Sequence, residues 1–411
     1  MRHWSRAIAA ALAGAVAGCS PGLCVTSDGG DDPDGSGGGE DGSFNVPPGP
    51  VTTIPLTGCG GLGYAANFTM GSEVFQLTID TGSGTLAVAS SSCANCDVTP
   101  TYTPGPTATD DQKQAMDAYL KGSWQGEIYT DAVQLAGMGA VTMNFVAIGA
   151  QTGFFNDAGC GLGTVSFAPQ GIAGFGPPDL ARPGTDGFVT ELSQAGAASD
   201  LFAFEFCSLG GQLMVGGIDP VSAALTGPAV YTPMMNAAAN LGDAGGSYYS
   251  VTLNDLQLGG TPLGYSAATF GVTAVDTGTS VLALPAAVFD TLTSQIDNNS
   301  AFVSAFGSQA GLFGTTMCLS SAWTTEEIDA QLPTLTLVFP SVFGGTVAVT
   351  LKATQSYLPP TQAGETTFYC SGILSNPGPG TILGTSAMLG QLVIFNLDDN
   401  EIGFAPQNFC R

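Results

Sequence analysis

Histidine is nearly absent from this sequence, and basic residues are rare. The single histidine is His3, which lies in an N-terminal segment that we expect to be removed. A mature chain starting at residue 19 would contain no histidine, which excludes Ser-His-Asp and Cys-His catalysis and histidine-ligated zinc. Lys and Arg together number 7 against 33 Asp and Glu, for a net charge of −26. This balance argues against a nucleic-acid partner and fits either activity at low pH or simple solubility.

Charged residues make up 10% of the 411 residues, whereas 59 are Gly and 25 are Pro. Such a composition favours many strands and turns over helices. The hydrophobic share of 44% is enough for a large core, and the length suggests two or three domains. We therefore expect an all-β fold class with a few short helices.

The N-terminus has the features of an export signal over residues 1–18. A basic start is followed by an apolar stretch, Ala7 to Val16, which is too short to span a bilayer as a mature helix. Val16-Ala17-Gly18-Cys19 then resembles a bacterial lipobox, in which Cys19 is lipidated and becomes the first residue. The alternative is an ordinary secretory signal. We expect an exported protein, anchored by lipid to a bacterial cell envelope or else secreted.

Residues 19–50 differ in composition from the rest of the chain. They contain several acids, no base, and many Gly, Ser and Pro. A segment of this kind cannot bury enough apolar surface to fold, so we interpret it as a flexible, solvated tether.

One short motif occurs twice. Leu77-Thr78-Ile79-Asp80-Thr81-Gly82-Ser83-Gly84 and Thr273-Ala274-Val275-Asp276-Thr277-Gly278-Thr279-Ser280 each take an apolar strand into Asp-Thr-Gly. Either copy alone could be an ordinary turn, since these residue types favour turns. Two copies in corresponding halves of the chain indicate a pair of carboxylates that act together. Close carboxylates share one proton and titrate as a unit, which suits acid and base roles in hydrolysis.

The paired motifs resemble those of the pepsin-type aspartic proteases, here in a member exported by a bacterium. The resemblance implies two related β lobes, residues 51–228 and 229–411, with a cleft between them and one catalytic Asp from each, Asp80 and Asp276. It also implies an aspartic endopeptidase that hydrolyses protein or peptide substrates as a monomer, with no cofactor and no metal. The residues expected to support the catalytic loops are Thr81, Gly82, Ser83, Thr277, Gly278 and Thr279.

Residues 118–131 resemble the family's flap hairpin and place Tyr119 at the flap tyrosine, which closes over the substrate. The alternative is a core tyrosine in an ordinary hairpin. Two departures stand out: Leu120 and Lys121 replace the usual small residues at the tip, and Ala87 stands where most relatives have a Trp that braces the tyrosine.

Other segments follow the same resemblance. Residues 170–176 and 381–384 match the elements that cross behind the two catalytic loops. We expect a helix over 188–195, closing strands within 389–406, and a helix over 286–298, which is the one convincing helical pattern of the second lobe.

The cysteines indicate an oxidising compartment. Cys93-Ala94-Asn95-Cys96 could be redox-active or half a zinc site in a cytosolic protein, but in an exported chain it predicts a small loop disulfide. The resemblance implies Cys93–Cys96 and Cys318–Cys370. The remaining cysteines could pair as Cys207–Cys410, as in some plant relatives, and Cys59–Cys160. This is one of many possible disulfide connectivities.

Two other functions stay open at this point. A catalytically silent pepsin fold that serves as a binding or inhibitor protein would keep the fold without the reaction. An adhesive or carbohydrate-binding surface lipoprotein would give no reason for the paired motifs.

Overall fold

The computed structural model describes residues 51–59, 63–119, 122–155, 158–159, 165–196, 199–238, 247–307, 311–315, 317–363, 365–408 and 410. All of them belong to one compact unit, Gly42–Arg411. The expected export signal, the tether and Cys19 lie outside the described residues, as do the tip residues Leu120 and Lys121 and the cysteine Cys160. None of the helices in the described part is long and apolar enough to cross a membrane.

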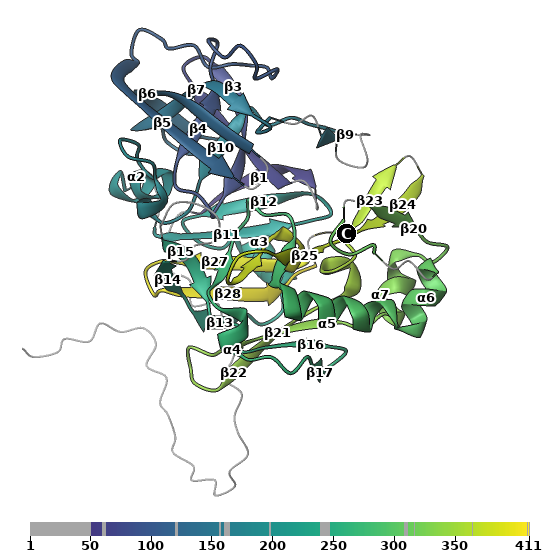
Figure 1. Ribbon diagram of the computed structural model, residues 1–411. Coiled ribbons are helices and arrows are strands. Elements are labelled where there is room, and N and C mark those ends of the chain that lie inside the picture. The colour runs from purple at the N-terminus through teal and green to yellow at the C-terminus, as the bar shows by residue number, and fades with distance from the viewer. Residues whose placement is uncertain are drawn as a thin grey trace, which may run out of the picture. The chain divides into compact units, whose positions relative to one another are not determined.

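The protein is mostly β, as the composition predicts, and its largest sheet has 13 strands (Figure 1). In spatial order these are β13 (Val230–Pro233), β28 (Glu401–Pro406), β27 (Gln391–Asn396), β11 (Leu201–Phe206), β12 (Leu209–Val215), β1 (Thr52–Cys59), β2 (Gly63–Met70), β3 (Glu73–Asp80), β10 (Gly171–Gly174), β4 (Leu86–Ala89), β7 (Val141–Thr152), β6 (Gly122–Leu135) and β5 (Thr109–Tyr119). The middle of the chain meets its C-terminal part where β11 pairs with β27.

The smaller sheets come mainly from the second half of the chain. The six-stranded sheet contains β14 (Met235–Ala238), β15 (Ser247–Val251), β18 (Thr273–Val275), β26 (Thr381–Leu383), β19 (Leu282–Pro285) and β25 (Ile373–Asn376). The others are β17 (Thr261–Pro262) with β16 (Asp255–Leu258), β21 (Leu335–Pro340) and β22 (Thr346–Leu351); β20 (Cys318–Ser320) with β24 (Thr366–Cys370) and β23 (Pro360–Ala363); and β8 (Ala158–Gly159) with β9 (Val165–Phe167).

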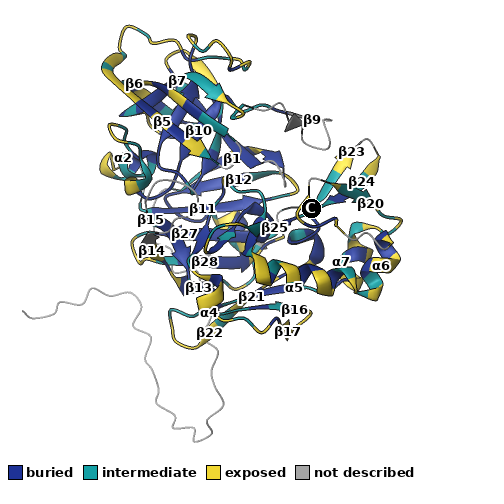
Figure 2. Cartoon of the chain, in the orientation of Figure 1, coloured by how far each residue is buried: buried dark blue, intermediate teal, exposed yellow. Residues whose placement is uncertain are grey.

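Alternating side chains explain how the strands build the core. Every second residue of β3 is buried, beginning with Phe75, as expected for a strand with one face on a core. The strands β11 and β27 are buried along their whole length and appear dark blue in Figure 2, because both faces of the sheet are covered here. Phe202 stacks on Phe395 across these two strands, with ring centroids 4.8 Å apart.

The helices expected over 188–195 and 286–298 are present as α2 (Phe188–Gln194) and α5 (Ala286–Asp297), and the second half of the chain also holds short helices that the sequence did not predict. The α-helices are α2 (Phe188–Gln194), α3 (Pro220–Leu225), α4 (Ala267–Phe270), α5 (Ala286–Asp297), α6 (Ser300–Phe306) and α7 (Thr325–Gln331), and the 3-10 helices are η1 (Pro178–Leu180), η2 (Ala353–Gln355) and η3 (Thr385–Ala387). Both α6 and α7 are too short for a strong periodic pattern, but each begins at a capping residue. Asn299 accepts hydrogen bonds from the backbone of α6, and Thr324 forms a capping box with Glu327 at the start of α7.

Disulfides join Cys93 to Cys96, Cys318 to Cys370, and Cys207 to Cys410. These are pairs expected from the sequence. The last one fastens the C-terminal residues next to the strand β11. Cys59 is also disulfide-bonded, but its expected partner Cys160 lies outside the described residues.

Candidate active site

The two Asp-Thr-Gly loops are built in the same way. Asp80 ends β3, and β10 runs parallel to β3 with Gly174 beside Asp80. Asp276 follows β18, and its backbone N–H donates to the carbonyl of Leu383 in the parallel strand β26 at 3.0 Å. The segments expected to cross behind the catalytic loops therefore lie where the sequence predicts, and each fixes the end of a strand that carries an Asp.

Thr81 and Thr277 join the two loops through four hydrogen bonds. The backbone N–H of each threonine donates to the hydroxyl of the other, both at 3.0 Å. The hydroxyls donate in turn to backbone carbonyls of the opposite strand, that of Thr81 to Val275 at 2.8 Å and that of Thr277 to Ile79 at 2.9 Å. Both side chains are buried. Because every polar atom of this cross-brace has a partner, the two loops are held in one relative position.

Each carboxylate also accepts two hydrogen bonds within its own loop. Asp80 accepts from the backbone of Gly82 at 2.8 Å and from the hydroxyl of Ser83 at 2.6 Å. The corresponding donors to Asp276 lie at the same distances, the backbone of Gly278 at 2.8 Å and the hydroxyl of Thr279 at 2.6 Å. These donors stabilise negative charge and fix the orientation of both carboxyl groups.

The two glycines allow the carboxyl groups to face each other. A Cβ atom on Gly82 would lie 2.6 Å from Oδ1 of Asp276, and one on Gly278 would overlap the carboxylate of Asp80. Any side chain at either position would therefore occupy the space of the opposite carboxylate. The close approach of Asp80 to Asp276 requires glycine at both places.

Burial and the neighbouring carboxyl group together change the acidity of Asp80. Asp80 is 4% exposed, and this burial raises its pKa well above the usual value. The nearby charge of Asp276 and a hydrogen bond with it raise the pKa further, while the donors Ser83 and Gly82 oppose the change. The site therefore retains a proton at a pH where an ordinary Asp is ionised.

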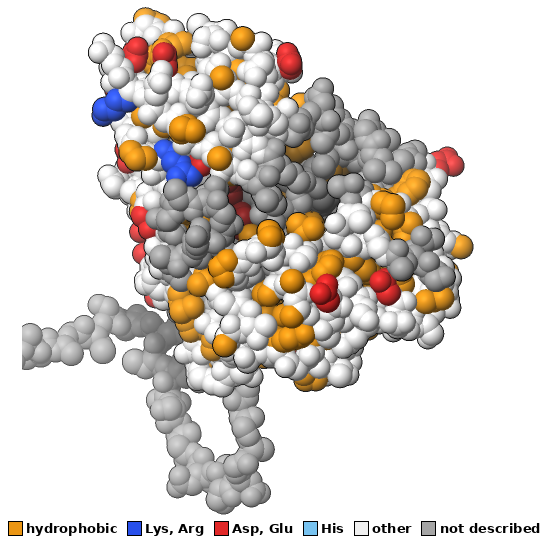
Figure 3. Space-filling model, in the orientation of Figure 1, with side chains coloured by type: hydrophobic (Ala, Val, Ile, Leu, Met, Phe, Trp, Pro, Cys, Tyr) orange, Lys and Arg blue, Asp and Glu red, His pale blue; other side chains and the backbone are white. Residues whose placement is uncertain are grey.

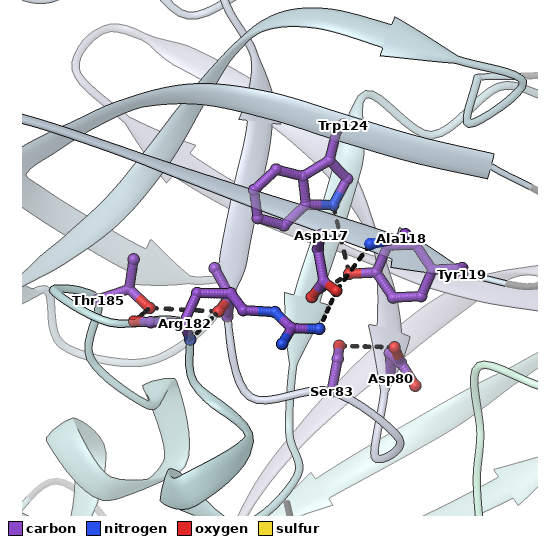
Figure 4. A network of polar contacts seen from close by, with 9 residues as sticks. Asp80, Ser83, Asp117, Ala118, Tyr119, Trp124, Arg182 and Thr185 are labelled. Atoms are coloured by element: carbon purple, nitrogen blue, oxygen red, sulfur yellow. Dashed lines mark hydrogen bonds and ion pairs between the residues drawn. The ribbon is translucent and has the colours of Figure 1, made fainter. Parts of the chain in front are cut away.

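Tyr119, labelled in Figure 4, lies at the end of β5, which pairs with β6 in an antiparallel hairpin. Its hydroxyl donates to Oδ2 of Asp117 at 3.3 Å. Burial raises the pKa of Tyr119 well above its usual value, and the charges of Asp117 and Asp80 add to this effect. The phenol is thus neutral and close enough to the dyad to be influenced by its charge.

The brace of Tyr119 was not identified from the sequence. Trp124, in β6, donates its indole N–H to the hydroxyl of Tyr119 at 3.3 Å. Trp124 is buried in the same apolar cluster as Ala87, the position where most relatives have a Trp. A signal was present, because Trp124 pairs across the hairpin with Asp117, which lies two residues before Tyr119 on the same face of the strand.

A second element that sequence analysis missed is an ion pair next to the dyad. Arg182, just after η1, forms it with Asp117 of the flap strand. These two residues line a small hollow with Ser83 and Tyr119. Among the described residues, no group of three or more His, Cys, Asp or Glu is placed to hold a metal ion.

Comparison with known proteins relates this chain to aspartic proteases. Residues 63–407 match the family of eukaryotic aspartyl proteases. A beta-secretase of Strongylocentrotus purpuratus is 27% identical over 383 residues, which cover 85% of this chain and 67% of the relative. An aspartic protease of Phaffia rhodozyma is 26% identical over 347 residues, covering 83% of this chain and 76% of the relative. A gastricsin of Cavia porcellus is 26% identical over 348 residues, covering 81% and 77%.

Proposed function

We propose, on the premise that this chain belongs to the eukaryotic aspartyl protease family and is an aspartic endopeptidase, that Asp80 and Asp276 are its catalytic dyad. The observation that carries this proposal is the symmetric arrangement of the two carboxyl groups. Each accepts from a backbone N–H and a hydroxyl of its own loop, and Thr81 and Thr277 hold the loops together.

In this mechanism the dyad holds one proton between two carboxyl groups. A water molecule bound by both is deprotonated by the ionised carboxylate and attacks the peptide carbonyl, which the protonated carboxyl group polarises. The raised pKa of Asp80 supports such sharing. Proton return to the leaving amine completes the cleavage. The reaction uses no covalent intermediate with the protein.

Tyr119 is assigned to substrate positioning. Flap closure over a bound peptide would exclude water and hold the scissile bond near the dyad. The half-buried side chain of Tyr119 and its hydrogen bond from Trp124 support this role, because a ring held in place can define one closed position.

The domain organisation and the location of the protein are further parts of the proposal. Residues 51–228 and 229–411 would form the two lobes, since each contains one Asp-Thr-Gly loop and one strand behind it. Residues 1–18 would direct export from a bacterial cell, with Cys19 lipidated and 19–50 acting as a tether. The disulfides support an oxidising compartment. We expect the mature protein to be a monomer.

A cleavage assay on casein between pH 3 and pH 7, with and without pepstatin, tests this function. We expect cleavage that is strongest at acidic pH and is abolished by pepstatin. Binding of casein without cleavage at any pH in this range would instead indicate the silent binding or inhibitor protein.

A further inference from the structure

We propose that Arg182, acting through Asp117, is a positioning residue that locks the flap strand to the loop of Asp80 and so sets the place of Tyr119 over the dyad. This inference rests on the proposed function of Asp80 and Asp276. Neither Arg182 nor Asp117 belongs to the Asp-Thr-Gly motifs, and 65 residues separate them in the chain.

The backbone of Arg182 is fixed to the catalytic loop. Its N–H donates to the hydroxyl of Thr85 at 2.8 Å, and its carbonyl accepts from the hydroxyl of Thr185 at 2.8 Å. Thr85 lies two residues beyond Ser83, which donates to Asp80. Gly84 touches the same segment, since a Cβ atom there would lie 2.5 Å from the backbone nitrogen of Ala181. A shift of Arg182 would therefore change the contacts of the loop that orients Asp80.

The side chain of Arg182 reaches the flap. Its guanidinium forms an ion pair with Oδ1 of Asp117 (Figure 4). Oδ1 also accepts from the backbone N–H of Ala118 at 2.9 Å, and Oδ2 accepts from the hydroxyl of Tyr119 at 3.3 Å. One carboxylate thus contacts the arginine, the flap backbone and the flap tyrosine. These contacts lead from Thr85 through Arg182 and Asp117 to Tyr119, and the chain itself connects Thr85 to Ser83.

The environment of Asp117 shows why the pair matters for position. The side chain of Asp117 is 2% exposed and that of Arg182 is 20% exposed. An ion pair this buried gains little net stability after desolvation, and its best-attested use is to specify one arrangement. Removing the arginine alone would leave a buried carboxylate beside Tyr119 without its counter-charge.

Basic side chains are scarce in the described part of the chain, so the position of Arg182 beside the loop of Asp80 is notable. Only Lys113, Arg182 and Lys352 are basic among the described residues, and the face in Figure 3 carries few blue side chains. Of these three, Arg182 lies in the wall of the hollow formed with Gly82, Ser83 and Tyr119. That hollow has a volume of about 10 Å³, roughly the space of one water molecule, so Arg182 lies close to the loop residues Gly82 and Ser83.

The test compares kcat and KM for Arg182→Gln, Arg182→Lys and the double variant Asp117→Asn/Arg182→Gln on one peptide substrate. We expect Arg182→Gln to lower kcat on the order of 10- to 100-fold with little change in KM, since misplacing a positioning contact mainly affects the transition state. Arg182→Lys should recover part of the loss. The double variant should be no worse than Arg182→Gln, because both changes break one interaction.

A fluorescence measurement separates positioning from mere stabilisation. In a Trp323→Phe background, Trp124 is the only tryptophan after residue 19 and reports on the flap through its bond with Tyr119. We expect its emission to shift to the red in Arg182→Gln and partly back in Arg182→Lys. The matched control is Asp329→Asn, which weakens the bonds to Thr354 and should lower the melting temperature without changing kcat.

Two results would overturn the proposal. One is a wild-type kcat in Arg182→Gln. The other is a wild-type kcat in the double variant. Because the double variant has no unpaired buried charge, it can be measured even if the single variant does not fold. If Asp80→Asn is inactive in the same preparation, such a result removes the role of Arg182 and leaves the dyad intact. Activity in Asp80→Asn would instead remove the proposed function itself.

Discussion

The hydroxyl of Tyr119 accepts a hydrogen bond from the indole N–H of Trp124 at 3.3 Å, across the hairpin that carries both residues. The resemblance to pepsin-type proteases implied that a Trp in the position of Ala87 would brace this tyrosine. Here the brace comes from the flap itself, and its ring packs in the cluster that contains Ala87. The tyrosine and the indole that holds it therefore belong to the same hairpin.

Loss of the tyrosine ring should weaken catalysis without abolishing it. Tyr119 is neither the acid nor the base, so Tyr119→Ala is expected to lose on the order of 10- to 1,000-fold in kcat/KM, or roughly 1.4 to 4 kcal/mol. Tyr119→Phe should lose less, because the ring stays and only the hydroxyl is removed. The measurement is kcat/KM for both variants on one peptide. Wild-type activity in Tyr119→Ala would make Tyr119 an ordinary hairpin residue.

Loss of the hydrogen bond from Trp124 to Tyr119 should reduce kcat/KM less than loss of the tyrosine ring. Trp124→Phe keeps an aromatic side chain in the buried cluster but removes the N–H donor to Tyr119. We expect about a 3- to 30-fold loss in kcat/KM, comparable to the loss of one hydrogen bond that positions a catalytic group. Trp323→Phe, outside the flap, serves as the control and should retain activity. Equal activities of the two variants would show that the indole bond has no role in catalysis.

A buried glutamate should make the protein more stable in acid. Glu205 of β11 is fully buried; Gln212 and Ser222 donate to its Oε2, while Oε1 has no partner among the described residues. Burial raises the pKa of Glu205 above its reference value of 4.5, and the two donors only partly oppose this. The native state then binds more protons than the unfolded state, so this stability is complete below pH 4.5 and is lost as pH rises through the folded-state pKa.

Glu205→Gln should therefore raise the free energy of unfolding at pH 7 and change it little at pH 4, measured by urea denaturation at both values. Glu326 provides a control of opposite sign. It is exposed at the start of α7, where hydrogen bonds from its own backbone N–H and from Thr324 lower its pKa, so Glu326→Gln should not stabilise the protein at pH 7. A Glu205→Gln variant that is less stable than wild type at pH 7 would contradict this account.

The proposed lipid anchor depends on Cys19, which lies outside the described residues. A single acyl chain anchors marginally, whereas two or more hold a protein firmly at a membrane. Cys19→Ser should therefore release the protein from the membrane fraction or block its maturation. Mass spectrometry of the mature N-terminus checks this directly, and an unmodified terminus downstream of Cys19 would exclude the anchor.

The dyad loops could be predicted from sequence because their signal is local and duplicated. A strand followed by Asp-Thr-Gly requires only neighbouring residues, and two copies such as those at Asp80 and Asp276 reinforce each other. The helices α6 and α7 were missed although Asn299 and Thr324 are typical capping residues. Over seven residues each, the apolar periodicity is too short to stand out from turns.

The contacts around the flap could not be predicted in the same way. The pairing of Arg182 with Asp117 joins residues 65 positions apart, so no neighbouring residue specifies it. The bracing of Tyr119 by Trp124 depends on the hydrogen bond between them within one hairpin, whereas the sequence shows only that the residue at position 87 is a small alanine. Contacts between residues that are not adjacent in the sequence decided both features.

The central claim is that Asp80 and Asp276 share the proton that drives peptide hydrolysis, and its most direct test is turnover by Asp80→Asn and Asp276→Asn. Asparagine is close to aspartic acid in shape, so both variants should fold like wild type, as judged by circular dichroism and melting temperature. We expect neither to cleave a peptide substrate measurably between pH 3 and pH 7. Wild-type turnover in either folded variant would contradict the account.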